Sequence, residues 1–343
     1  MRSTDAGATW TAGFWFGASS HFRLRFASPT IGLAVSAIGG LTLRTTDGGE
    51  TWTRIGGGTI DENVTGMAAS PSGNVVLAGS LGRDLLRSAD GGATWAHPAF
   101  SPVGLQFQKP SFATEQRVIA IRPAGRIALS VDAGQTWSIA YDRLGQVGLT
   151  NTTMASATVG LVVGDNGLIL RSTDGGSSWA EVPSGTTLPL KSVGCLTAAV
   201  CLAGGFDGAL LRSIDGGATW SVARLPVTAS GSQIRTIARF NDTTAVLAVD
   251  DGLWRSADAG LTWTRVYTPI RGSQLGVSFN ASGIGIATGY DGILRSTDQG
   301  LSWTRQSVPA PSYLNAVTWV TATTVLVGGD GGAILRNLQA GAP

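Results

Sequence analysis

The chain has 343 residues, enough for one large repeat domain or two ordinary domains. Hydrophobic residues make up 43% of it, which supports a sizeable core and excludes a disordered chain. Charged residues make up only 13%, and the formal net charge of +2 gives no reason to expect nucleic-acid binding. The 49 glycines, with abundant Ser and Thr, favour short strands and tight turns over long amphipathic helices.

The start of the chain leads directly into a repeat, from Arg2 to Trp10, without a basic segment followed by an apolar one. We therefore expect no signal peptide in this chain. The uncharged stretch from Gly145 to Gly164 is long enough for a membrane span, but its Thr, Asn and Gly residues predict two strands and a turn. We expect no membrane insertion.

A nine-residue motif, Arg-Ser-x-Asp-x-Gly-x-Thr-Trp, recurs eight times at intervals of 40 to 43 residues, and we call it the turn motif. Its Asp residues are Asp5, Asp47, Asp90, Asp132, Asp174, Asp215, Asp258 and Asp298. Its Trp residues are Trp10, Trp52, Trp95, Trp137, Trp179, Trp220, Trp263 and Trp303. The hydroxyl and the carboxylate accept hydrogen bonds from a tight turn, the Gly allows positive φ, and the Trp ring packs between sheets. We therefore assign these Asp and Trp residues structural roles.

The turn motif resembles the Asp-box, also called the bacterial neuraminidase or BNR repeat. Over essentially the entire chain the sequence is similar to the photosystem II stability/assembly factor-like family of Asp-box β-propellers. This resemblance implies a β-propeller with an assembly or protein-binding role. The same box occurs in sialidases, xyloglucan-active glycosidases and sortilin-type receptors, so it specifies fold better than function.

Each repeat predicts four antiparallel strands. In the unit that starts at Ser192 we expect an inner strand over 193–195, a second over 200–203, a third over 209–213 and an outer strand over 219–223. Asn-Gly and Asp-Gly pairs, such as Asp207-Gly208, predict two-residue hairpins between second and third strands. The turn motif joins the third strand to the outer strand. Four strands in about 42 residues form one propeller blade.

The two ends of the chain predict how the ring closes. The first motif is followed only by an outer strand near 11–17, whereas the last three strands stop at Leu335-Arg336-Asn337, where a ninth motif would begin. Joining the N-terminal outer strand to the C-terminal three strands builds a composite blade from 1–17 and 312–337 and removes two exposed edges. We predict a single all-β propeller domain over 1–343 with eight four-stranded blades, and seven as the alternative.

Catalytic chemistry finds little support in the sequence. A sialidase would need three arginines for the substrate carboxylate, a Tyr nucleophile assisted by a Glu, and an acidic proton donor. Sialidase domains also have six blades with long loops, whereas the repeats of this chain have almost constant length. Glycosidases need two carboxylates across a groove, and the candidates outside repeated positions are Asp61, Glu62, Asp142 and Asp242. Solvated loop charge is the simpler explanation for them. We assign no catalytic residue, no cofactor and no metal, because His21 and His97 lie in no ligand-spaced cluster.

Cys195 and Cys201 are the only two cysteines and fall on consecutive strands of one predicted blade, nearly opposite each other. Either a disulfide or two buried free thiols would fit this placement. The family resemblance includes exported bacterial members with a similar cysteine pair, and a disulfide would imply an oxidising compartment.

Two repeated sets of polar residues have structural and functional interpretations. Hairpin aspartates recur at equivalent positions and either form turns or line one face with acidic groups: Asp165, Asp207, Asp251, Asp291 and Asp330. Arginines precede the motif Ser in most repeats, except at Leu129, and either pack against the turns or form a basic belt: Arg44, Arg87, Arg171, Arg212, Arg255 and Arg295.

Ligand binding is expected in the loops between outer and inner strands, where aromatic and Arg residues provide interface anchors. The candidates are Tyr141, Arg143, Tyr267, Arg271, Tyr313 and His97. We expect a non-enzymatic binding or assembly scaffold for a protein or glycan partner, extracytoplasmic or on a virion surface. The alternative is a glycan-active hydrolase of the Asp-box propeller type.

Overall fold

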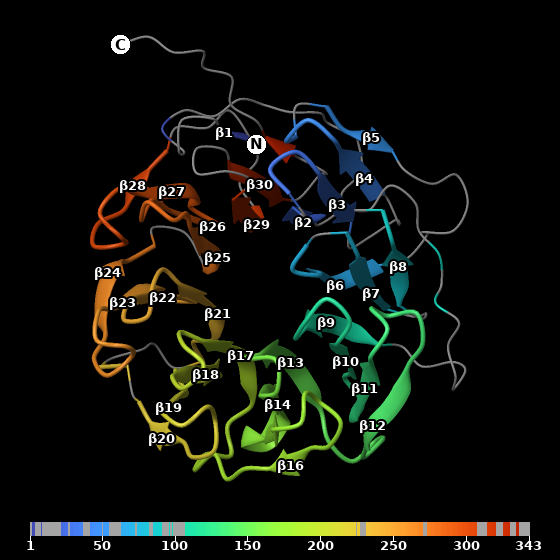
Figure 1. Cartoon of the computed structure of the whole chain (residues 1–343). Helices are drawn as coiled ribbons and strands as arrows, with labels where there is room; N and C mark the ends of the chain where they lie inside the picture. Colours follow the sequence, from blue (N-terminus) through green and yellow to red (C-terminus); the bar gives the residue numbers. More distant parts are fainter. Residues whose placement is uncertain are drawn as a thin grey trace.

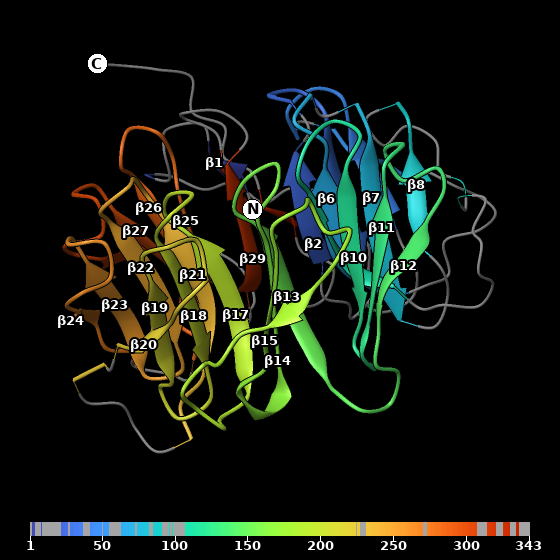
Figure 2. The ribbon, with the colours of Figure 1, turned by 60° about the horizontal axis from the view of Figure 1, so that its bottom comes forward.

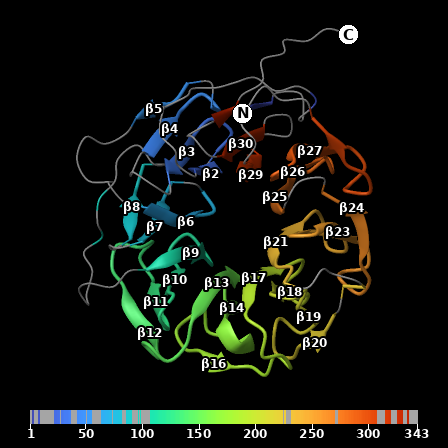
Figure 3. The ribbon, with the colours of Figure 1, turned by 180° about the vertical axis from the view of Figure 1, so that it is seen from behind.

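A computed structural model describes the chain, and its strands form one ring of antiparallel sheets around a central axis (Figures 1 and 3). The described residues are 2–3, 8, 22–26, 28–36, 42–49, 51–54, 63–72, 74–81, 85–90, 96, 98, 107–223, 225–226, 231–269, 273–306, 314–319, 325–329 and 334–335. The chain is therefore a single all-β propeller.

Six blades are complete four-stranded antiparallel sheets whose strands follow one another in chain order. The first is β2 (Phe22–Phe26), β3 (Gly32–Ser36), β4 (Thr42–Thr45) and β5 (Thr53–Arg54). The next three are β9 (Gln108–Phe112), β10 (Val118–Arg122), β11 (Arg126–Ser130) and β12 (Ser138–Asp142); β13 (Leu149–Met154), β14 (Gly160–Gly164), β15 (Ile169–Ser172) and β16 (Ala180–Glu181); and β17 (Leu190–Cys195), β18 (Cys201–Gly205), β19 (Leu210–Ser213) and β20 (Ser221–Val222). The last two are β21 (Ile234–Arg239), β22 (Ala245–Val249), β23 (Gly252–Ser256) and β24 (Thr264–Tyr267); and β25 (Gln274–Phe279), β26 (Gly285–Gly289), β27 (Gly292–Ser296) and β28 (Thr304–Arg305).

Two further sheets depart from this four-stranded order. One has the three strands β6 (Asn63–Ala69), β7 (Val76–Leu81) and β8 (Leu86–Ser88), beside which Ala96 forms an isolated bridge to Arg87. The other joins β29 (Leu314–Trp319), β30 (Val325–Gly329) and β31 (Ile334–Leu335) to the N-terminal strand β1 (Arg2–Ser3).

The prediction of eight four-stranded blades, with seven as the alternative, is wrong, because the residues that the structure describes form six four-stranded blades. At the ring closure, the N-terminal strand that the structure describes is the short strand β1. β1 and β31 both pair with β30, β1 against Leu326 and Val325 and β31 against Val327 and Gly328. β1 and β31 therefore lie along the same edge of β30, one after the other, and share the position of a third strand.

The register explains this error. In complete blades the Arg-Ser pair of the motif ends the third strand, as Arg295 and Ser296 do in β27. The N-terminal Arg2-Ser3 takes that same place beside β30, so the start of the chain continues a third strand. The predicted outer strand at 11–17, and most of the predicted composite blade over 1–17 and 312–337, lie outside the described residues.

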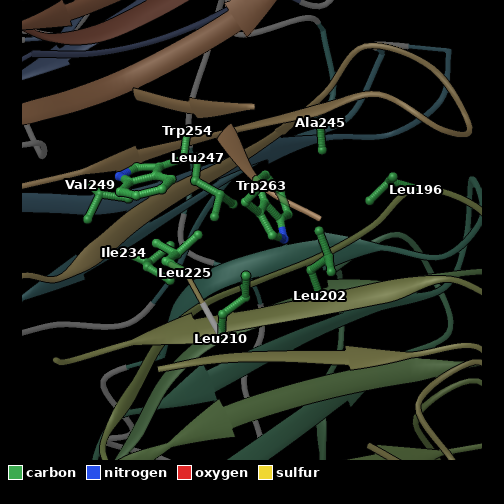
Figure 4. Packing of buried hydrophobic residues seen from close by; sticks show 10 residues of the cluster. All are labelled: Leu196, Leu202, Leu210, Leu225, Ile234, Ala245, Leu247, Val249, Trp254 and Trp263. Carbon is green, nitrogen blue, oxygen red and sulfur yellow. The ribbon is translucent and has the colours of Figure 1, made fainter. Parts of the chain in front are cut away.

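The core lies between neighbouring blades. Figure 2 shows the sheets facing one another around the ring. Second strands are covered on both faces, and every residue of β14, β18, β22 and β26 is buried. In one cluster Trp263 packs among Leu202 and Leu210 of the preceding blade and Leu247 of its own blade (Figure 4). Burial of such a Trp contributes roughly 5 kcal/mol gross, which makes the motif Trp a main source of inter-blade packing.

The turn motif folds as a hydrogen-bonded unit, as the blade β17–β20 illustrates. The Ser213 hydroxyl donates to Asp215 Oδ1 at 2.7 Å and accepts the N–H of Gly217 at 2.8 Å. Asp215 also accepts the N–H of Thr219 at 2.9 Å and its hydroxyl at 2.6 Å. The Trp220 indole N–H donates to the Gly217 carbonyl at 3.1 Å. Equivalent Asp side chains at Asp47, Asp132, Asp174, Asp258 and Asp298 make the same contacts with their turns.

In five pairs of neighbouring blades, an arginine of the preceding blade donates a hydrogen bond to this turn, whereas the Nε of Arg44 is buried without a hydrogen-bond partner among the described residues. Arg171 donates through Nε to the Gly216 carbonyl at 2.8 Å, and Arg212 donates to the Ala259 carbonyl at 2.6 Å. Arg87 and Arg255 make the same bond to the following blade. In the blade where Leu129 interrupts the series, Arg117 from a different turn donates to Gly175 instead at 2.6 Å. We call this bond the arginine clasp.

Candidate functional site

Three of the six predicted ligand-binding residues lie in the described part of the chain, and they belong to two different blades. Tyr141 lies on β12 and Tyr267 on β24, in blades that are separated by two other blades (Figure 1). Arg143 is an exposed residue that follows β12. Arg271, Tyr313 and His97 lie outside the described residues, as do Asp5, Trp10 and Trp95 of the motif set.

Tyr267 links two blades. Its hydroxyl donates a hydrogen bond of 2.8 Å to Asp291 Oδ2 in the hairpin of the next blade, where Asp291 is fully buried. Burial first, and then this carboxylate, raise the pKa of Tyr267 to about 12. A phenol held in this way cannot reach a ligand without giving up an inter-blade bond.

Tyr141 is half-buried against the core between blades β9–β12 and β13–β16. Burial raises the pKa of its phenol, the Glu181 carboxylate of the neighbouring blade adds to this rise, and Arg143 opposes it. At this blade boundary, the charges of Arg143 and Glu181 therefore lie near enough to the Tyr141 phenol to affect its pKa.

The carboxylates considered for catalysis have other partners in the structure. Asp142 accepts the Arg126 Nε–H at 2.8 Å, and this bond lowers the pKa of Asp142. Asp242 forms an ion pair with Arg239 at 2.6 Å. This pair lies at the strand ends opposite to those near Asp142. Asp61 and Glu62 lie outside the described residues. The structure brings no two of these four candidates together across a groove within its described part.

The motif aspartates are held as anions by their turns. The hydroxyl and N–H of Ser178 lower the pKa of Asp174 to about 2, and those of Thr219 lower the pKa of Asp215 to about 2. A carboxylate with these fixed donors is a poor proton donor near neutral pH, so its environment suits turn formation.

The hairpin aspartates also have individual partners. Asp165 pairs with Lys191 at 3.2 Å, Asp207 accepts the Gly231 N–H at 2.6 Å, and Asp251 pairs with Arg265 at 2.7 Å. Arg265 in turn lies 4.7 Å from the centre of the Trp254 ring, a cation–π contact. Among these aspartates, the Asp165 side chain is 47% exposed and borders a groove.

A groove of about 940 Å³ lies between blades β9–β12 and β13–β16, in the lower part of Figure 1. Its walls are the hairpins 123–124 and 165–168 and the loops 145–148 and 181–187. Gly145 and Gly185 occupy corresponding loops with φ of +75° and +76°, and a Cβ at either would meet no atom within 4 Å. The loops therefore leave open space at both glycines.

The groove lining contains several polar side chains. It includes the carboxylates of Asp165 and Glu181, the amides of Gln146 and Asn166, and the hydroxyls of Thr186 and Thr187. Lys191, which lies outside the lining, has its ammonium group on Asp165 and over the Phe206 ring at 5.2 Å. These groups can hydrogen-bond to a polar ligand that is laid across two blades.

Sequence analysis missed this groove, since it selected aromatic and Arg residues in the loops. The available signals were the glycines of the loops and the Asn166-Gly167 hairpin, whose Asn166 has φ of +55°. Asp165 itself was named, as one of the hairpin aspartates that could line a face.

A disulfide joins Cys195 to Cys201, which are directly paired residues of β17 and β18. Cys201 is fully buried and Cys195 is half-buried beside a second cavity of about 370 Å³, which Arg239 and Asp242 also line. Within the described part of the chain, no group of three or more His, Cys, Asp or Glu residues is placed to hold a metal ion. The described residues also contain no helix of the length and apolarity that a membrane span requires.

Comparisons with known proteins place this fold among solved propellers. No protein-family model matches the sequence, and no curated protein matches it. YCF48 bound to a D1 peptide is similar in structure with a TM-score of 0.64 at 16% identity, over 96% of this chain and 97% of that one. YCF48 from Cyanidioschyzon merolae gives 0.63 at 18% identity, over 96% and 98%. Sqt1 from Saccharomyces cerevisiae gives 0.76 at 12% identity, over 97% and 100%. At these identities the likeness shows the β-propeller fold.

Proposed function

We propose that the protein is a non-enzymatic β-propeller scaffold that binds a segment of a protein partner in the groove between blades β9–β12 and β13–β16. The observation that carries this proposal is the groove itself, whose volume of about 940 Å³ lies at the upper end of ordinary ligand sites. A site of this size can hold several residues of an extended peptide.

The rigidity of the walls supports this use. Main-chain hydrogen bonds hold the walls together: the Gly145 N–H donates to the Ala124 carbonyl at 2.7 Å, and the Asp165 N–H donates to the Gly148 carbonyl at 2.9 Å. A preformed site loses less conformational entropy on binding than a mobile one, so more of its contact energy contributes to affinity. Main-chain groups and hydroxyls along the walls match the donors and acceptors of a peptide backbone.

Two likenesses favour a protein partner. The turn motifs resemble Asp-box repeats of the assembly factor-like family, and the YCF48 structure of similar fold holds a D1 peptide. We extend this mode of use, and not that particular partner, to the present chain. The Cys195–Cys201 disulfide supports an oxidising location, such as an extracytoplasmic or virion surface.

The test is a selection of displayed random peptides on the full chain, followed by affinity measurement on a groove-filling variant. Thr187→Trp places a large ring at an exposed position of the groove lining and should abolish binding of the selected peptides. Ala218→Trp is the matched control, because it lies in a turn motif at the opposite strand ends, where Leu261 and Leu301 are exposed in other blades.

Three outcomes decide the proposal. Peptides that bind the wild type and Ala218→Trp but not Thr187→Trp support it. Peptides that bind all three proteins equally refute the groove as the site. A glycan array that gives ligands, together with hydrolysis of those glycans, would replace the scaffold by the alternative glycan-active function.

A further inference from the structure

We propose that the groove selects a basic peptide segment, with Lys or Arg side chains placed on Asp165 and Glu181. This inference rests on the proposed function and specifies the chemistry of the partner. The two carboxylates are the charged side chains of the groove lining, and no basic residue belongs to that lining among the described residues. The groove is thus locally acidic in a chain whose net charge is +2.

The two carboxylates differ in how they are engaged. Asp165 is 47% exposed and accepts the Lys191 ammonium at 3.2 Å on one oxygen. This internal pair demonstrates that an ammonium group fits at Asp165, and the second oxygen stays directed toward Gly148, where a Cβ would lie 2.1 Å from Oδ2. Glu181 is exposed at the end of the outer strand β16 and lines the same groove.

The two cations described beside the groove, Lys191 and Arg143, lie outside its lining. Lys191 approaches Asp165 from the β17 side and is held over Phe206. Arg143 lies in the loop before Gly145 and acts on Tyr141, but it is not part of the lining. A basic side chain that enters the groove therefore meets Glu181 directly and competes with Lys191 for Asp165.

The shape of the groove favours a segment with small residues between the basic ones. Gly145 and Gly185 leave open space at the two loop crests, and the adjacent walls carry main-chain groups and short hydroxyl side chains. A peptide backbone can approach the crests closely at these two glycines, because neither glycine carries a side chain. Specificity then comes from the charges at the two carboxylates.

The experiment measures fluorescence anisotropy of three labelled eight-residue peptides, with alternating Lys-Gly, Glu-Gly or Ser-Gly sequence, on the full chain. We expect the Lys-Gly peptide to bind best and to weaken as salt rises, because exposed charge pairs are screened. Glu181→Gln and Asp165→Asn should each weaken its binding about three- to fivefold, the range for exposed ion pairs. Lys191→Met should strengthen it by a similar factor, since the competing ammonium is removed.

The control is Glu115→Gln, which neutralises an exposed Glu at the opposite strand ends that interacts with Ser72. It should leave Lys-Gly binding unchanged. The gain expected for Lys191→Met cannot arise from partial unfolding, so it separates a charge effect from loss of structure.

The proposal is overturned if the Lys-Gly peptide does not bind, binds no better than the Glu-Gly peptide, or is insensitive to both carboxylate substitutions. The peptide selection distinguishes this failure from failure of the proposed function. Selected peptides that are blocked by Thr187→Trp but lack basic residues would leave the scaffold function standing and remove the charge preference. The absence of any selected peptide would remove both.

Discussion

The arginine clasp gives the most specific prediction about stability. Replacing Arg212 by Met keeps an unbranched apolar stem but removes the bond from Nε to the Ala259 carbonyl at 2.6 Å. Hydrogen bonds from charged donors contribute about 1.5–3 kcal/mol, and the partial exposure of this pair places the expected loss in free energy of unfolding at about 1–2 kcal/mol. For a chain of this length the melting temperature should fall by roughly 2–3 °C.

The stronger test compares this variant with Arg117→Met. Arg117 lies outside the turn motif, yet its Nε donates to Gly175 at 2.6 Å, in the blade pair where Leu129 stands at the usual Arg position. Arg117 also donates to the Asp174 carbonyl at 2.9 Å, so urea unfolding should give a loss for Arg117→Met at least as large as that for Arg212→Met. Arg143→Met, at an exposed position, should change stability by less than about 0.5 kcal/mol. If Arg117→Met lowers the free energy of unfolding no more than Arg143→Met does, the arginine clasp does not generally stabilise the contacts between blades.

Four further predictions concern turns, charge, the disulfide and an inter-blade bond. Ala259→Gly should stabilise the protein by about 1 kcal/mol in urea unfolding, because Ala259 has φ of +58°, a conformation that costs a non-glycine residue about 1–2 kcal/mol; a loss of stability would contradict this. The pKa of Asp215 in the folded protein is about 2. Its contribution to stability is therefore complete above its unfolded pKa near 3.9 and is lost as the pH falls toward 2. In Asp215→Asn, the urea midpoint should depend less on pH between pH 5 and pH 2. Reduction of the Cys195–Cys201 disulfide should lower the unfolding free energy by about 2 kcal/mol, whereas the double Ala variant should be insensitive to reductant. Tyr267→Phe should lower the free energy of unfolding by about 1 kcal/mol, because it removes the hydrogen bond to Asp291. It should also remove a phenol that titrates near pH 12 in the ultraviolet spectrum, and an unchanged titration would exclude the bond to Asp291.

The blade architecture was predictable because each repeat contains its own turn motif and hairpin residues. The expected strands of the unit after Ser192 agree with β17 to β20, and Asp207-Gly208 forms the predicted hairpin with positive φ at both residues. Ring closure was not predictable from the same pattern. It depends on which positions of β30 the distant strands β1 and β31 occupy, and that register is decided by pairing across the whole length of the chain.

The candidate site shows the same division. Tyr141 and Tyr267 were selected as aromatic loop anchors, but their places in different blades and the bond from Tyr267 to Asp291 direct them to other roles. Asp165 and Glu181 are 16 residues apart and belong to different repeated positions, so no motif connects them. The folding of blade β13–β16 places the β14–β15 hairpin and the end of β16 at the same groove.

By itself, the sequence determined the turns: Ser, Asp, Gly and Trp at fixed spacing bond within nine residues and need no distant partner. Tertiary structure alone decided the six four-stranded blades and the position of the groove. It also decided that Arg117 makes the arginine clasp in the blade where Leu129 stands at the usual arginine position. The physical reason is range. Local hydrogen bonds depend on residues that are neighbours in the chain, whereas blade completion, clasps and grooves depend on contacts between repeats that only the closed ring brings together.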